Sequence, residues 1–284
     1  MMATLPSAGS LCSAFIMGLL ICGPAFADDF AIAVSPPRFE LSAKPGETVR
    51  AVAELSNRSG SPTELTFATA EWDLTPDGGV VLSEALRPDS CRPWVAIERR
   101  QTVLPGQTQL RYRFEVTPPL DAPATECRFA IVVSGGDVQI SPTENVDVPV
   151  RGQIALIVYV AVGGVKPELE IVKADVVDLN GALTPVLMVQ NTGTAHGRLS
   201  AFLSGTDASG IRREFSPSTL PILPGETRMI ALHPDVSGDA IEAQIAGARA
   251  DDHEESVQIV YPLTVEGTIN DSNKSFRFQG VFEP

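Results

Sequence analysis

The chain carries one strand-and-turn pattern twice. In the first copy an alternating apolar segment ends at Asn57, and in the second copy a similar segment ends at Asn191. Each copy is followed later by a Leu-Pro-Gly turn, at 104–106 and at 223–225, and then by another alternating segment. Alternation with a period of two residues is the pattern of a half-buried strand. Two copies of this pattern therefore indicate two similar β domains in tandem.

Strand signals continue through the rest of the chain. Residues 93–103 and 127–134 are further strand candidates, and residues 145–162 predict a long strand broken by Pro149 and Gly152. Turn signals recur about every 8–12 residues, as in a sandwich of short strands. Sustained helical periodicity is absent from the sequence. We therefore predict an all-β protein with two tandem immunoglobulin-like β-sandwich domains.

The first 27 residues have the apolar segment and the cleavage motif of a secretory signal peptide, although they lack the basic residue that usually precedes the apolar segment. They hold an apolar stretch of about nine residues and end in Ala25-Phe26-Ala27, which fits the small-x-small cleavage rule. The stretch is too short to cross a bilayer, which takes about 20 apolar residues. We predict cleavage after Ala27 and export to the periplasm. The glycines and proline of residues 163–167 mark a link between a domain at 28–163 and a second at 164–284.

Charge and motifs exclude several classes of function. The formal net charge is −14, and no basic stripe with interleaved aromatic residues is present, so nucleic acid is not an expected partner. Later apolar segments are too short for membrane insertion. The histidines lie in separate turn-like segments without a nucleophile or metal-ligand motif. The sequence therefore predicts no enzyme activity, no metal and no cofactor.

Two cysteines remain after removal of the signal peptide. Cys91 and Cys127 form a lone pair, and in an oxidising compartment such a pair usually forms a disulfide. The alternative is two reduced and partly buried thiols.

The first half of the chain resembles the periplasmic pilus chaperones, the PapD-like family. The order and spacing of six short segments fit strands A to F of the first domain of that family. These segments are 35–41, the turn at 45–47, 55–57, 93–95, the turn at 104–107 with Arg111 behind it, and 128–131. The resemblance covers residues 28–162, whereas the second half resembles the family only as another immunoglobulin-like sandwich.

The resemblance implies binding by β-strand donation. Family members lend the last strand of domain one to an incomplete subunit, so that backbone hydrogen bonds hold the partner and alternate side chains fill its groove. Residues 145–162 are the candidate donor strand. The candidate partner-binding side chains form two alternating rows, Val146, Val148 and Val150, then Ile154, Leu156 and Val158. The alternative, favoured for 154–162 because both faces of that run are apolar, is that these side chains fill a core.

The resemblance also implies an anchor for the carboxylate at the end of the subunit. Arg38 lies where the family has its arginine. The lysine of the family is missing, since residues 154–159 contain no basic side chain. We therefore predict a divergent member of the family.

Two functional hypotheses follow. The first is a periplasmic chaperone that binds secreted pilin-like subunits, with an outer-membrane usher as a further candidate partner. The alternative is a structural or adhesive immunoglobulin-like module of the cell envelope that has no client subunit.

Overall fold

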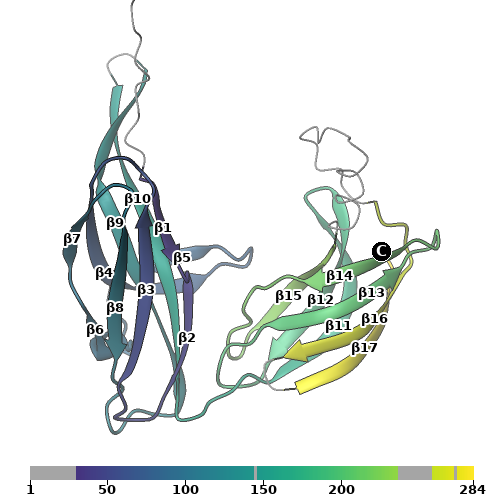
Figure 1. Cartoon of the computed structure of the whole chain (residues 1–284). Coiled ribbons are helices and arrows are strands. Elements are labelled where there is room, and N and C mark those ends of the chain that lie inside the picture. The colour runs from purple at the N-terminus through teal and green to yellow at the C-terminus, as the bar shows by residue number, and fades with distance from the viewer. Residues whose placement is uncertain (1–29, 144–145, 236–257, 272–273) are drawn as a thin grey trace, which may run out of the picture.

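A computed structural model of the chain describes residues 30–143, 146–235, 258–271 and 274–284. The predicted signal peptide at 1–27 lies outside the described residues. Almost all of the regular structure is strand, and the described residues include no helix that is long and apolar enough to cross a membrane. Figure 1 shows two sandwiches beside each other, joined at one end by the segment that follows β10.

The first sandwich contains ten strands in two sheets. One sheet has the order β1-β3-β8-β6, and the other has the order β2-β10-β9-β4-β5, with β7 also paired to β4. The strands of this sandwich are β1 (Ile32–Ser35), β2 (Arg38–Ala43), β3 (Val49–Asn57), β4 (Thr63–Leu74), β5 (Val80–Ser83), β6 (Val95–Ile97), β7 (Gln101–Leu104), β8 (Gln109–Val116), β9 (Thr125–Thr143) and β10 (Val146–Val162). The alternating burial of β3 and β8 places their apolar side chains in a shared core.

Among the described residues, the second sandwich is one path of seven strands that bends back on itself. Its order is β11-β12-β15-β14-β13-β16-β17. The strands are β11 (Leu169–Leu179), β12 (Ala182–Asn191), β13 (Leu199–Thr206), β14 (Arg212–Pro217), β15 (Thr227–Pro234), β16 (Leu263–Asp271) and β17 (Lys274–Phe282). Strands β14 and β15 pair over three residues only, and side chains from both halves of the path share one core. The all-β class and the two tandem immunoglobulin-like sandwiches agree with the sequence prediction. We propose the predicted ranges 28–163 and 164–284 as the two domains.

Two local predictions were wrong. Residues 93–103 do not form one strand, because the chain makes a 3₁₀ turn at Arg92–Trp94 and then changes sheets: β6 pairs with β8, and β7 pairs with β4. Strand β10 is not broken at Pro149 and Gly152. It continues through both, and the irregularities are register shifts against β9, between Val146 and Val148 and between Arg151 and Gln153.

The repeated Asn-to-Leu-Pro-Gly pattern has a structural reason. The side chain of Asn57 is buried and donates from Nδ2 to the carbonyl oxygen of Leu104 (3.1 Å) and to that of Ser61 (2.9 Å). Asn191 is fully buried and donates from Nδ2 to the carbonyl oxygens of Ala195 (2.8 Å) and Ile222 (2.9 Å). Asn57 therefore links the end of its strand to the first residue of its Leu-Pro-Gly turn, and Asn191 links the end of its strand to the residue just before its turn.

We expect Asn191→Ala to lower the free energy of unfolding by about 2–4 kcal/mol, since buried polar groups would lose their partners. The Asn191 Oδ1 atom also accepts from the backbone N–H groups of Gly193 (2.9 Å) and Glu168 (3.1 Å). Thr192→Ala, at the exposed next position, is the control and should cost less than about 0.5 kcal/mol. Urea unfolding of the two variants measures the difference, and equal midpoints would contradict this role for Asn191.

Candidate functional site: the open edge of β10 and the cleft between the domains

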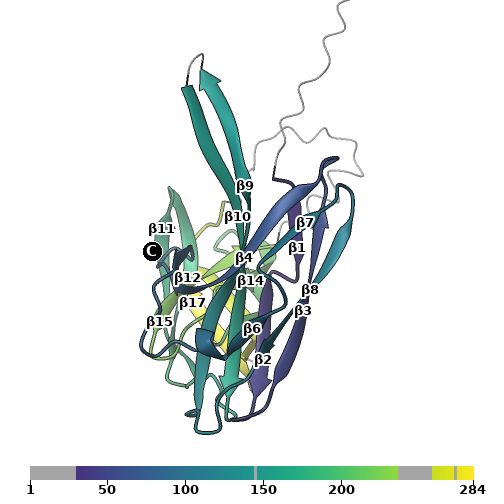
Figure 2. The ribbon, with the colours of Figure 1, turned by 90° about the vertical axis from the view of Figure 1, so that its left-hand side faces the viewer.

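Strand β10 is paired on both sides only over its second half. Its pairing with β9 runs from Val146 to Val162, whereas its parallel pairing with β2 runs only from Ile157 to Val162. Within the part of the chain that the structure describes, residues 146–156 therefore have no strand on the β2 side; we call this stretch the open edge. It spans about 36 Å at the usual rise per residue. Figures 1 and 2 show that the β9–β10 hairpin extends beyond the rest of the first sandwich.

The even-numbered positions of β10 lie on the face that meets the core. Leu156, Val158, Val160 and Val162 have no exposed surface, and Ile154 packs against the edge of the same core. Successive residues of a strand alternate between faces, so positions 146, 148, 150 and 152 continue this row beyond the core. Val150 is 42% exposed. We call positions 146, 148, 150, 152 and 154 the donor row.

The predicted partner-binding residues thus fall into two groups. Val150 and Ile154 lie on the open edge, where Val150 is exposed and Ile154 is partly buried, whereas the side chains of Val146 and Val148 lie outside the described part. Leu156 and Val158 are sealed in the sandwich core and cannot offer their side chains to a partner without opening it. We therefore leave these two residues out of the binding surface proposed below.

The other face of β10 meets the second domain. Tyr159 is 2% exposed and belongs to a small apolar cluster with Trp72 on β4 and Ala130 on β9. Leu223, from the second Leu-Pro-Gly turn, packs against this cluster. The Arg228 side chain donates from Nη1 to the carbonyl oxygens of Thr75 (3.1 Å) and Pro76 (3.2 Å) in the β4–β5 turn. Both faces of the apolar run at 154–162 are thus covered, which is why the run lacks a polar face.

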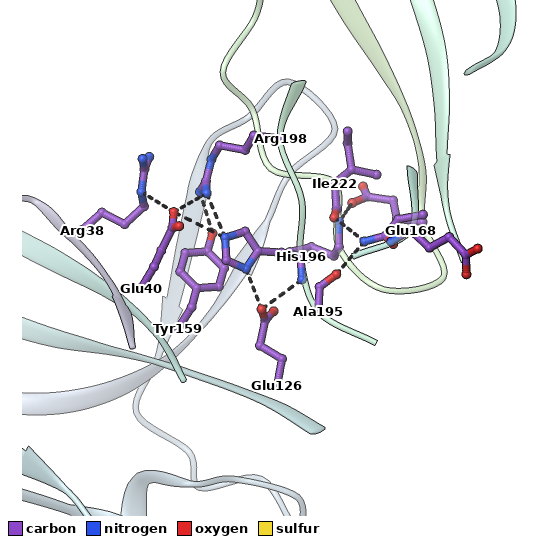
Figure 3. A network of polar contacts seen from close by, with 12 residues as sticks. Arg38, Glu40, Glu126, Tyr159, Glu168, Ala195, His196, Arg198 and Ile222 are labelled. Carbon is purple, nitrogen blue, oxygen red and sulfur yellow. Dashed lines mark hydrogen bonds and ion pairs between the residues drawn. The ribbon is translucent and has the colours of Figure 1, made fainter. Parts of the chain in front are cut away.

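A polar network joins the two sandwiches at His196 (Figure 3). The His196 ring stacks on Tyr159 at 3.7 Å between centroids, and its Nδ1 atom lies 2.5 Å from Oε2 of Glu126. Arg198 donates from Nη1 to Oε1 of Glu40 at 2.6 Å and lies 2.8 Å from Nε2 of His196. A neutral His196 ring that carries its proton on Nδ1 can donate to Glu126 and can accept from Arg198 at Nε2.

The network shifts two pKa values. The hydrogen bond to His196, opposed by partial burial and aided by the charge of Arg198, lowers the pKa of Glu40 to about 2. Burial alone would lower the pKa of His196, but its hydrogen bonds to Glu126 and Glu40 outweigh burial and the repulsion from Arg198, so the pKa is raised. When the ring is protonated, Nε2–H faces Oε1 of Glu40 at 3.5 Å.

We expect the domain interface to be less stable at pH 8.5 than at pH 6. A histidine whose folded pKa is raised contributes stability that is full below its unfolded pKa, about 6.5, and is lost as the pH rises through the folded value. The lowered pKa of Glu40 acts at the acid end, where stability is lost only as the pH falls from about 4.5 toward 2. Thermal unfolding at both pH values measures the effect. His196→Gln should remove most of the difference, and an unchanged difference would contradict the assignment.

Arg38 lies where the open edge ends. It is paired with Ile157, the first residue of β10 that contacts β2, and its Nε atom lies 3.0 Å from Oε1 of Glu40. Arg38 lines a cleft of about 540 Å³ together with Arg198 and Lys274 from the second domain. Three basic side chains line the cleft, and they are paired with only two carboxylates, those of Glu40 and Asp271. The local charge is therefore positive, whereas the net charge of the whole chain is negative. The sequence resemblance implied a lysine on the last strand of the first domain, and β10 lacks one at residues 154–159. Two basic side chains, Arg198 and Lys274, reach the same cleft from the second domain.

Sequence reasoning missed Arg198 and Lys274. They are separated from Arg38 by 160 and 236 positions, and no local pattern marks either residue. The described residues contain no group of histidine, cysteine or acidic side chains that could hold a metal ion.

Comparison with known proteins gives structural similarity only. No protein-family model and no curated protein matches the sequence. The class 5 fimbriae chaperone CfaA is similar at a TM-score of 0.43 and 11% identity, over 89% of this chain and 99% of that one. The E. coli chaperone DraB has the same TM-score at 15% identity, over 89% and 97% of the two chains. This chain is similar to fimbrial chaperones.

A third similar structure contains a bound subunit. It is the Salmonella enterica SafA pilin in complex with the SafB chaperone, at a TM-score of 0.43 and 13% identity, over 89% of this chain and 96% of that one.

Proposed function

We propose that this protein is a periplasmic chaperone for secreted fimbrial or pilus-type subunits and that it binds them by donating β10. One observation carries the proposal: the core-facing row of β10 continues past the core along an edge that has no partner strand among the described residues. An unpaired edge offers backbone hydrogen bonds, and an alternating apolar row offers side chains for a groove. A partner strand that lacks its own neighbour can use both.

The two faces of the open edge differ in polarity, which sets the orientation of the partner. The odd-numbered positions between 147 and 153 are Asp147, Pro149, Arg151 and Gln153, whereas the donor row holds three valines, a glycine and an isoleucine. A subunit groove that takes up the apolar face leaves the polar face in water. This polarity also protects the open edge in the free protein, since charged residues and proline on an edge strand disfavour uncontrolled pairing.

The cleft supplies an end point for a strand that pairs with the open edge. A strand that lies against residues 146–156 has one end beside Arg38, where β2 takes over the pairing. The basic cleft fits a chain terminus that carries a carboxylate, and guanidinium groups bind carboxylates through paired hydrogen bonds. We propose that Arg38, with Arg198 and Lys274, binds the carboxyl end of the subunit. An outer-membrane usher is a further proposed partner of the loaded complex.

The periplasmic location is part of the proposal. It is supported by the predicted signal peptide and by the Cys91–Cys127 disulfide, whose Cα atoms lie 5.9 Å apart.

The test is co-expression in a bacterial periplasm with each small secreted protein found to be encoded near the gene of this protein. We expect a 1:1 complex by size exclusion and mass measurement, and loss of soluble subunit when this protein is omitted. Arg38→Ala should weaken the complex about tenfold, the effect of losing one charge-assisted hydrogen bond. Arg50→Ala is the matched control, since Arg50 lies on β3 in the other sheet and pairs with Glu115. A subunit that folds and stays soluble alone would overturn the proposal.

A further inference from the structure

The donor row has a gap at Gly152, where β10 has no side chain. Gly152 lies at the register shift between Arg151 and Gln153. On β9, the residues opposite this shift include Gly135 and Gly136. Gly135 is also the last residue of β9 that pairs with β4. The two glycines therefore mark the point where the sandwich ends and the projecting hairpin begins.

The ring of Phe30 fills this gap. A Cβ atom added to Gly152 would overlap the ring, and one added to Gly135 would lie 2.6 Å from its Cδ2 atom. Real Cβ atoms do not approach other atoms so closely, so only glycine fits at these two positions while the ring is present. Gly152 and Gly135 thus form a seat for one aromatic side chain, which we call the glycine seat.

The backbone on either side of the ring is held in place. Ala31 accepts a hydrogen bond from the backbone N–H of Arg58 at 2.8 Å, and Ile32 begins the pairing of β1 with β3. On the other side, Gln153 donates from Nε2 to Oγ of Ser134 at 3.1 Å, which ties β10 to β9 beside the glycine seat. Phe30 is partly buried and packs against the edge of the same core as Ile154. The ring therefore lies on the face of β10 that carries the donor row.

We propose that Phe30 supplies the apolar side chain that Gly152 lacks, and that the groove of the bound subunit receives the Phe30 ring as part of the donor row. This inference rests on the proposed function. A donor row without the ring has a hole one side chain wide between Val150 and Ile154, and a hole in a packed interface forfeits its van der Waals contacts. Phe30 thus sets specificity: the groove must offer an aromatic-sized pocket at this level.

The glycine seat permits an exchange of side chains that tests the inference. Phe30→Ala should weaken the complex with the co-expressed subunit about 30-fold, as expected for loss of an aromatic anchor. Gly152→Val alone should also weaken it, because valine and the ring compete for one volume. The double variant Phe30→Ala/Gly152→Val should restore the affinity to within about fivefold of the wild type, since a valine then completes the donor row.

Leu110→Ala is the control for lost packing alone. Leu110 also packs against the edge of the first core, but it lies on β8 in the other sheet. We expect a lowered melting temperature with an unchanged dissociation constant for this variant. The inference is overturned if Phe30→Ala behaves in the same way, or if the double variant binds no better than Phe30→Ala. The ring would then only fill space in the core of the free protein. If the wild-type protein captures no subunit, the proposed function fails instead, so the two failures are distinguishable.

Discussion

Val150→Glu should reduce the affinity of this protein for its subunit by at least 100-fold while the free protein stays folded. In the free protein the side chain at 150 is 42% exposed, so a carboxylate there remains hydrated and costs less than about 0.5 kcal/mol. In the complex the same carboxylate enters an apolar groove. Burying an unpaired charge costs several kcal/mol, and each 1.4 kcal/mol is a factor of ten in affinity.

Gln153→Glu is the matched control for this substitution. It adds the same side chain three positions away, on the polar face of the open edge, and its carboxylate can still accept a hydrogen bond from the Ser134 hydroxyl. We expect a change in affinity of less than about threefold. Co-purification with the subunit and the melting temperature of each free variant give both readouts. If the two variants retain the subunit equally, the apolar face of β10 does not enter the groove of the subunit.

The parts of the structure that follow from local pattern could be predicted. The strands around Asn57 and Asn191 have a regular alternation, and the two asparagines make equivalent contacts in the two sandwiches, so the repeat in sequence is a repeat in structure. The pairing of Cys91 with Cys127 follows from there being only two cysteines after residue 27. Alternation also separates the valines of the donor row from their polar neighbours, because a strand has only two faces.

The contacts between distant residues could not be predicted. Glu40 and Arg198 are 158 positions apart, and their ion pair exists because the second sandwich packs on the outer face of β10. No period in either segment encodes that packing. The glycine seat is similar: Gly152 looks like a strand breaker in the sequence, and only the position of Phe30 shows why a glycine is needed there.

Removing the disulfide by Cys91→Ala/Cys127→Ala should lower the free energy of unfolding by about 4 kcal/mol. The two cysteines are 36 positions apart, and closing a loop of that length restricts the unfolded chain by this amount in the chain-entropy model. Both sulfur-bearing side chains are buried, so the bond is part of the first core. It ties the segment before β6 to β9 at Cys127, which pairs with Val160 of β10.

Urea unfolding of the oxidised protein, the reduced protein and the double alanine variant measures the contribution of the disulfide. We expect the reduced protein and the variant to unfold at similar, much lower urea concentrations. The donor row should be less affected than the core, because Cys127 pairs near the end of β10 that β2 also covers. A reduced protein as stable as the oxidised one would contradict the assignment. The disulfide forms only where thiols are oxidised, so the stability of this fold depends on export. A copy kept in a reducing compartment would lack the stabilisation by the disulfide. Its β10 would be held less firmly near Val160, which pairs with Cys127.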